Sequence, residues 1–290
     1  MPIPSSPRRW THACGGERVS SEGFQHVKVG DIDIAYVESG QGEPLVLLHG
    51  GESHRGQFDA FRPLLGAGIL AISFDQRDTG DTLNGPEPYD IVRQAADCAD
   101  FLAALGFERA HVMGVSYGGA IAMHLAIHYP QRVASLILSG ATPSWTMTES
   151  LGDRIVAMGP DARAQFALDL LLTPEGQAND PQLVADTKRA PRGRPVDADA
   201  RRMTAIQNHD CTARLHEITA PTLVLHGAQD PIVRAQVAEL MASEIPGARL
   251  VILPRTRHGI TFEAREQAAR LARDFVLSHA VGTVSTGNGG

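Results

Sequence analysis

Short apolar runs recur along the first half of the chain, each bounded by glycine, proline or polar residues as buried strands are. Longer segments between them, such as residues 89–105, repeat apolar residues at helical spacing. This alternation predicts an α/β fold, with a mainly parallel sheet covered by helices on both faces. Ligands of such a sheet bind beyond the carboxyl ends of its strands. The strands that we expect are residues 32–38, 44–48, 69–74, 111–115 and 133–139.

The alternation of strands and helices stops near Gly140 and resumes near Pro221. Residues 147–172 between these points have a helical period, and a polar stretch follows them. We therefore predict that residues 141–215 form a helical cap lobe over the active site. The other parts that we predict are a core of residues 23–140 and 216–281 and flexible ends of residues 1–22 and 282–290, which are rich in Pro, Gly, Ser and Thr.

The polar part of the expected cap lobe is basic, and it leaves two interpretations open. It could recognise an acidic substrate, or it could be a solvated surface in which the cations alternate with Asp197 and Asp199. The mixture of signs favours the solvated surface. The basic residues are Lys188, Arg189, Arg192, Arg194, Arg201 and Arg202.

The segment Gly114-Val115-Ser116-Tyr117-Gly118 joins an expected buried strand to a helix that starts with small residues. This arrangement presents a serine hydroxyl at a sharp turn, where glycines avoid collisions between neighbouring backbone segments. The start of the helix also offers unpaired NH groups and a positive dipole end to an oxyanion forming at Ser116. Since the chain contains 29 glycines, a loop serine remains the alternative until partners are found.

Two further strand ends supply such partners. Residues 223–227 form an apolar strand, and Asp230 follows them in a turn that contains Pro231. Residues 250–253 form another strand, and His258 lies between it and the last expected helix. The chain order Ser116, Asp230, His258 is that of the nucleophile, acid and base of strand-built hydrolases. We therefore predict these three as the catalytic residues.

Other residues of the same types have structural interpretations. Asp210 is the rival acid, but it precedes the last strands and is expected to belong to the cap lobe or to its exit. His226 is expected to pack at a strand end. His124 and His128 are spaced like a metal pair, but no Glu or Cys completes a ligand set, so we predict packing and no metal. For Arg77, bracing of its loop through backbone carbonyls is favoured over contact with substrate.

Composition narrows the class of protein. A chain of 290 residues with 43% hydrophobic residues suits one core with an inserted lobe. The net charge of −7 and the absence of a long basic block predict no nucleic-acid partner, and no stretch is long enough to span a membrane. Cys14, Cys98 and Cys211 are odd in number and widely spaced, which favours reduced thiols and a cytoplasmic location. The oligomeric state is not predicted.

The motifs together resemble the serine hydrolases of the α/β-hydrolase superfamily, from about Gly23 to Ala280. The resemblance implies an eight-stranded, mainly parallel sheet with a helical cap after strand six. His49-Gly50-Gly51-Glu52 resembles the loop that carries the second oxyanion donor, which implies the NH groups of Gly51 and Tyr117 as the oxyanion hole. The segment from Arg77 to Gly80 resembles the aclacinomycin methylesterase and small esterase group, although Asp81-Thr82 stand where that group has serine.

The activity expected from these residues is hydrolysis of a small or medium carboxylic ester through an acyl-enzyme, with no cofactor. A lactonase, a carbon–carbon bond hydrolase and a cofactor-free perhydrolase of the haloperoxidase type remain alternatives. A peptidase similar to proline iminopeptidases is disfavoured, because Glu52-Ser53 replaces the Pro-Gly of that family's oxyanion loop. A non-catalytic ligand-binding protein on the same scaffold is the alternative from a different class.

Overall fold

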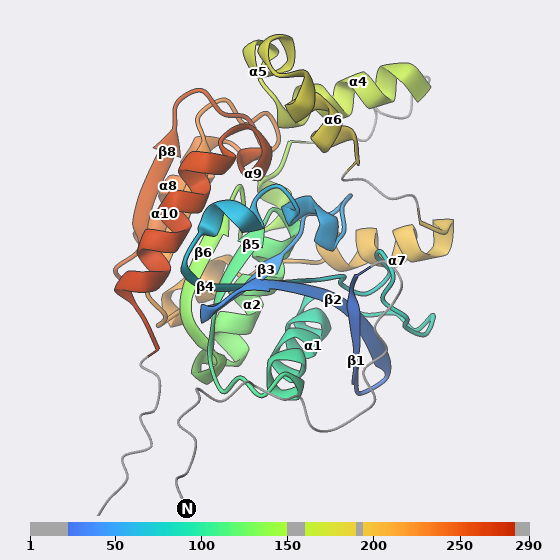
Figure 1. Cartoon of the computed structure of the whole chain (residues 1–290), viewed down its shortest axis with the longest axis vertical. Coiled ribbons are helices and arrows are strands. Elements are labelled where there is room, and N and C mark those ends of the chain that lie inside the picture. The colour runs from blue at the N-terminus through green and yellow to red at the C-terminus, as the bar shows by residue number, and fades with distance from the viewer. Residues whose placement is uncertain (1–22, 150–159, 190–193, 282–290) are drawn as a thin grey trace, which may run out of the picture.

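The computed structural model describes residues 23–149, 160–189 and 194–281, and its centre is an eight-stranded sheet in the order β1-β2-β4-β3-β5-β6-β7-β8 (Figure 1). β1 pairs with β2 and β2 with β4 in antiparallel fashion, and every other pair is parallel. The predicted mainly parallel sheet is therefore confirmed. The strands are β1 (Gln25–Val29), β2 (Ile32–Gly40), β3 (Gly42–Leu48), β4 (Gly68–Phe74), β5 (Ala110–Val115), β6 (Val133–Ser139), β7 (Thr222–Gly227) and β8 (Arg249–Leu253).

Helices cover both faces of the sheet, and the side chains of each strand alternate between the two resulting cores. In β3, for example, Val46 and Leu48 join the core beneath α1, α2 and α8, whereas Leu45 and Leu47 join the core beneath α10. All four are fully buried, which is why the strand is a continuous apolar run. The helices are α1 (Ile91–Ala104), α2 (Tyr117–His128), α4 (Pro160–Leu171), α5 (Pro174–Asn179), α6 (Pro181–Arg189), α7 (Val196–Gln207), α8 (Ala235–Glu244), α9 (Ile260–Glu263) and α10 (Arg265–Ser278).

The segment between β6 and β7 carries α4, α5, α6 and α7, and we call it the β6–β7 insertion (Figure 1). In the figure, α4, α5 and α6 lie together above the rest of the molecule, while α7 lies apart from them, on the same side as β1 and β2. Two adjacent arginines tie α7 to the turn after β4. Arg201 forms an ion pair of 2.7 Å with Asp78, and Arg202 donates to the carbonyl of Arg77 at 3.0 Å.

Some of these elements were not predicted from the sequence. β1 was not expected, because Gln25–Val29 is a short edge strand with one fully buried side chain, Val29. The basic stretch was expected to be polar surface, yet its residues lie partly in α6 and α7. Before it, α5 begins after Thr173, whose side chain caps the helix. The predicted flexible ends, 1–22 and 282–290, lie outside the described residues. None of the helices in residues 23–149, 160–189 and 194–281 has the length and apolar character that a membrane span requires.

Candidate active site

Ser116 occupies a sharp turn between β5 and α2. Its φ of 51° and ψ of −114° lie in a region that side-chain-bearing residues rarely adopt. The turn is held by hydrogen bonds on both sides: the Ser116 NH donates to the carbonyl of Ser139 at 2.9 Å, and the Ser116 carbonyl accepts from the NH of Gly119 at 2.8 Å. The hydroxyl is therefore presented at the carboxyl edge of the sheet on a strained residue, as the sequence motif predicts.

Two glycines of the motif are required by close packing rather than by a positive φ. A Cβ on Gly114 would lie 2.3 Å from the carbonyl oxygen of Gly118. A Cβ on Gly118 would lie 2.2 Å from the carbonyl oxygen of Leu48, at the end of β3. Both contacts are far shorter than van der Waals distance, and both obstacles are backbone atoms that cannot rotate away. The glycines therefore allow the start of α2 to approach the ends of β3 and β5.

Asp230 and His258 meet beyond the ends of β7 and β8. Nδ1 of His258 lies 2.7 Å from Oδ2 of Asp230, and both side chains are buried. The other carboxylate oxygen, Oδ1, accepts from the NH groups of Ile232 at 2.8 Å and Val233 at 3.0 Å. Burial raises the pKa of Asp230, but its hydrogen bond with His258 and the hydrogen bond from the Val233 NH outweigh it, so that the net pKa is lowered. Asp230 is thus an ionised carboxylate that contacts the His258 ring.

The end of β6 brings Ser116 and His258 into the same site. Ser139, its last residue, accepts from the Ser116 NH, and a Cβ on the next residue, Gly140, would lie 3.4 Å from Nδ1 and Cε1 of His258. Gly140 has a φ of 56°, so glycine is favoured there on backbone grounds as well. Within the described residues no hydrogen bond joins the Ser116 hydroxyl to His258. Such bonds are commonly long in ligand-free sites and shorten when substrate binds.

The loop after β3 lies against the start of α2. A Cβ on Gly51 would be 3.8 Å from the Cβ of Tyr117, so the two residues are neighbours. The preceding residue, Gly50, donates its NH to Oε1 of Gln57 at 2.9 Å, and Nε2 of Gln57 donates to the hydroxyl of Thr261 in α9 at 3.2 Å. Tyr117 is the first residue of α2, and NH groups in the first turn of a helix have no partner within it.

The side chain of His49 stabilises this loop through contacts of both ring nitrogens. Its Nδ1 lies 2.8 Å from the carbonyl oxygen of Gly50, and its Nε2 lies 3.4 Å from the NH of Gln76. A ring that donates at Nδ1 and accepts at Nε2 is neutral. Burial lowers the pKa of His49 well below its usual value, and the positive charge of Arg202 lowers it further. These contacts give the His49 side chain a structural role in this loop.

A cavity of about 150 Å³ opens between this site and α7. Ser116, Tyr117 and Gly51 line it from the core, and Arg202, Met203 and Ile206 line it from α7. Arg202 is 2% exposed, and its guanidinium lies 4.1 Å from the centre of the Tyr117 ring. Both Arg202, at 3.4 Å, and Arg194, at 2.9 Å, donate to the Gly51 carbonyl.

The structure corrects the expectation about Arg77 and agrees with the one about His226. Arg77 does brace its loop, but through the carboxylates of Asp97 and Asp31 at 2.6 and 2.8 Å rather than through backbone carbonyls. Asp210, the rival acid, is exposed and accepts from the NH of Thr212 at 2.9 Å. His226 is buried in β7, and its Nε2 lies 2.8 Å from the carbonyl oxygen of Val233.

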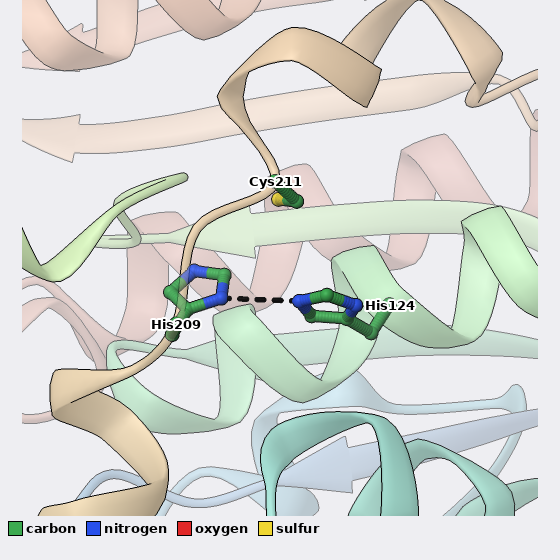
Figure 2. Close-up of side chains that lie close together, drawn as sticks. All are labelled: His124, His209 and Cys211. Atoms are coloured by element: carbon green, nitrogen blue, oxygen red, sulfur yellow. Dashed lines mark hydrogen bonds between the residues drawn. The ribbon is translucent and has the colours of Figure 1, made fainter.

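Three buried side chains with metal-binding atoms lie together near α2, and Figure 2 shows them: His124, His209 and Cys211. Their ligand atoms lie within 4.8 Å of one another. The sequence argument that no cysteine accompanies His124 is therefore wrong, because the other two side chains come from a segment far along the chain. His128 instead stacks on His124 with ring centres 5.7 Å apart.

Hydrogen bonds already join the two histidines of this cluster. Nε2 of His209 lies 3.1 Å from the carbonyl oxygen of Thr142 and so carries a proton, while its Nδ1 lies 3.2 Å from Nε2 of His124. Burial lowers the pKa of His124 to about 4 and raises that of the Cys211 thiol to about 12. The cluster has zinc-type donors, but a metal would have to break the bond between the imidazoles and displace the thiol proton.

Comparison with known proteins places the chain in a family. The family model described as the alpha/beta hydrolase fold matches residues 43–264. The chain belongs to the α/β-hydrolase fold family. The turn at Ser116, the Asp230–His258 pair and the cap-like insertion after β6 thus lie on the scaffold that the sequence motifs predicted.

Relatives of the chain include enzymes of several names. A pimeloyl-[acyl-carrier protein] methyl ester esterase of Neisseria meningitidis serogroup C is 30% identical over 243 residues, which cover 79% of this chain and 92% of that protein. A non-heme haloperoxidase of Rhodococcus erythropolis is 30% identical over 246 residues, covering 79% and 90%. The solved structure of a thermophilic esterase from Thermogutta terrifontis with malate bound is 25% identical, with a TM-score of 0.78, and the match covers 89% of this chain and 100% of that one.

Sequence reasoning missed the polar side chains that connect the loops of the site. Gln57 links Gly50 to α9, and Gln76 links the carbonyl of His49, at 3.0 Å, to Arg202, at 3.1 Å. Arg202 lay within the basic stretch, but its burial was not expected. The one available signal was the helical period of residues 196–207, which places Arg202, Ala205 and Ile206 on one buried face.

Proposed function

We propose that the chain is an ester-bond hydrolase in which Ser116 is the nucleophile, His258 the general base and Asp230 the residue that orients the histidine. The observation that carries this proposal is the arrangement of Asp230. Its Oδ1 is fixed by two backbone NH groups, and its Oδ2 lies 2.7 Å from Nδ1 of His258. This holds the His258 proton on Nδ1 and leaves Nε2 free to accept a proton from serine.

In the proposed mechanism, His258 removes the hydroxyl proton while Ser116 Oγ attacks the ester carbonyl carbon. The resulting oxyanion lies beside the NH groups of Gly51 and Tyr117, which stabilise it. His258 then donates the proton to the leaving alcohol, which departs as the carbonyl forms again and leaves an acyl-enzyme. Water that loses a proton to His258 attacks this intermediate, and a second tetrahedral intermediate collapses to the free acid and Ser116.

A small ester is the substrate class that the site supports best. The cavity of about 150 Å³ is lined largely by apolar side chains and is closed on one side by α7, so we propose that the β6–β7 insertion acts as a cap. One relative is named as a methyl ester esterase, and the Arg77–Gly80 segment resembles methylesterases. Methyl and other short-chain esters are therefore the first substrates to test.

The test is intact-mass spectrometry of the wild type and Ser116→Ala after exposure to a fluorophosphonate, with p-nitrophenyl acetate, butyrate and octanoate as turnover substrates. We expect one adduct per wild-type chain, none on the variant, and turnover that falls at the longest chain. Wild type that forms no adduct and hydrolyses none of the esters would overturn the proposal. An adduct that persists in Ser116→Ala would place the nucleophile elsewhere.

A further inference from the structure

Arg202 is a buried cation of α7, and none of the acidic residues that the structure describes forms an ion pair with it. Its guanidinium donates hydrogen bonds to three neutral oxygens, which are the carbonyl oxygens of Arg77 and Gly51 and Oε1 of Gln76. No carboxylate of the described residues lies within ion-pair distance of it, and its buried Nε has no hydrogen-bond partner. Removing a guanidinium from water without a counter-ion is costly, and a buried donor without an acceptor adds to that cost.

The other charges that line the cavity do not neutralise Arg202. Within the described part of the chain, Arg194 Nε also has no partner, but its guanidinium pairs with Asp199 at 3.2 Å, and the Asp199 side chain is 52% exposed. Glu52, the remaining acidic residue of the lining, is exposed. Both carboxylates are therefore at the solvent side of the cavity, while the Arg202 charge is on the inner side. The inner part of the cavity therefore carries a net positive charge that an anionic ligand would neutralise.

The position of Arg202 relates this charge to the reacting centre. Its guanidinium stacks on the ring of Tyr117, the residue after Ser116, and donates to the carbonyl of Gly51. It thus contacts both residues that we propose as oxyanion donors, and one of them, Tyr117, is next to Ser116 in the sequence. A cavity of about 150 Å³ holds a ligand of roughly benzene's size, so an anionic group on the substrate has to lie a few atoms from the ester carbonyl.

We propose that Arg202, with Arg194 beside it, forms a carboxylate-binding subsite, and that the enzyme acts on small esters that carry a second, ionised carboxyl group on the acyl side. This rests on the proposed hydrolase function of the same site. A guanidinium matches a carboxylate in geometry and charge, and hydrogen bonds between charged partners are the stronger ones. The interpretation of the basic stretch as recognition of an acidic substrate is thereby preferred for Arg202, whereas exposed Arg189 fits the solvated-surface interpretation.

A purely structural role for Arg202 predicts different behaviour. If Arg202 acted only by fixing the Gly51 carbonyl, its loss would lower the hydrolysis of acidic and neutral esters by the same factor. If it binds the substrate carboxylate, its loss reduces the hydrolysis of the acidic ester more. The ratio of the two values of kcat/KM therefore separates the roles, whatever the variant does to turnover in general.

Monoethyl succinate and ethyl butyrate are a matched pair, since they differ in the replacement of a methyl group by a carboxylate. We expect wild type to prefer monoethyl succinate, and Arg202→Met to lower that preference by about ten- to a hundredfold, the size of a lost hydrogen bond between charged groups. Arg202→Lys keeps the charge and should retain part of the preference. Arg189→Met removes a cation whose side chain is 70% exposed and should leave the preference unchanged.

Equal kcat/KM of wild type for the two esters, or an unchanged ratio in Arg202→Met, would overturn the subsite. The wild-type comparison decides the question even if Arg202→Met fails to fold. Calorimetric binding of monoethyl succinate to Ser116→Ala tests the subsite without catalysis. Binding there that is lost in Ser116→Ala/Arg202→Met, together with a wild type that hydrolyses neither ester and forms no fluorophosphonate adduct, would support the subsite and overturn the hydrolase function. No binding and no preference would overturn the subsite, while ethyl butyrate turnover would leave the hydrolase function in place.

Discussion

Asp230→Asn tests the proposed mechanism at a single atom. Oδ1 of Asp230 accepts from the NH groups of Ile232 and Val233, so an asparagine has to place its carbonyl oxygen there. Its NH2 group then occupies the position of Oδ2, 2.7 Å from Nδ1 of His258. An NH2 group donates and cannot accept, so His258 would have to present a lone pair at Nδ1 and carry its proton on Nε2. That tautomer cannot accept the proton of Ser116.

The expected effect is large on catalysis and small on folding. The wrong tautomer lowers kcat on the order of 10⁴-fold, which is about 5.4 kcal/mol of transition-state stabilisation. The fold keeps the two backbone hydrogen bonds to Oδ1 and the packing of the side chain. Because the pKa of Asp230 is lowered in the fold, the ionised carboxylate contributes stability at neutral pH that the amide lacks. We therefore expect a modest loss of stability and a protein that is folded at assay temperature.

The assay is steady-state hydrolysis of p-nitrophenyl butyrate at pH 8, with circular dichroism to verify folding. Asp210→Asn is the matched control, since it removes one carboxylate of the same type whose contact is the NH of Thr212. We expect the control to retain most of the wild-type turnover. If folded Asp230→Asn keeps a tenth or more of the wild-type kcat, Asp230 does not orient the base, and the reasoning from its hydrogen bonds is refuted.

Three stability predictions follow from the same region. Ser116→Gly should be about 1 kcal/mol more stable to urea than Ser116→Ala, because glycine tolerates the φ of 51°, and equal stabilities would contradict the strain. Gly118→Ala should lower the free energy of unfolding by about 2 kcal/mol or more, because its Cβ would lie 2.2 Å from a backbone oxygen. The control Gly85→Ala, whose Cβ would have its nearest atom at 3.9 Å, should lower it by under about 0.5 kcal/mol. Similar losses of stability in the two variants would contradict the packing argument. Burial lowers the pKa of His124 from 6.5 to about 4. Between pH 6.5 and pH 4 the unfolded chain therefore binds a proton at this residue that the folded chain does not. The free energy of unfolding falls by about 3 kcal/mol as the pH falls through this range. His124→Gln should show a shallower fall of unfolding free energy from pH 7 to pH 4.5, and an unchanged slope would show that His124 does not titrate in this way.

The parts of the site that follow strands could be predicted from the sequence because local patterns define them. Ser116 comes directly after a buried apolar strand, and Asp230 and His258 each follow another strand within a few residues. Parallel strands place their carboxyl ends at one edge of the sheet, which is why we predicted that the three residues lie at that edge. The glycines of the nucleophile turn were predictable for the same reason, since a sharp turn leaves no space for side chains.

The connections between loops could not be predicted, because nothing in a single sequence relates residues that are far apart in it. Gln57 and Thr261 are separated by 204 residues, and Arg202 and Gln76 by 126. The cluster of His124 with His209 and Cys211 was missed in the same way, since sequence spacing pointed to His128 as the partner. Side-chain pairing of this kind depends on the path of the β6–β7 insertion, which has no periodic signal that fixes its position on the core.

Arg201 and Arg202 show what the structure adds to a count of charges. They are adjacent on α7, and a helix turns about 100° per residue, so one side chain can pair at the surface while the other enters the site. Arg201 has two carboxylate partners, Asp78 at 2.7 Å and Asp197 at 2.9 Å, and Arg202 has none among the described residues. The paired arginine fixes α7 on the turn after β4, and that contact holds the unpaired one inside the cavity. A buried charge is tolerated where its neighbours are held in place, and its missing counter-ion is then the best available indication of what the cavity binds.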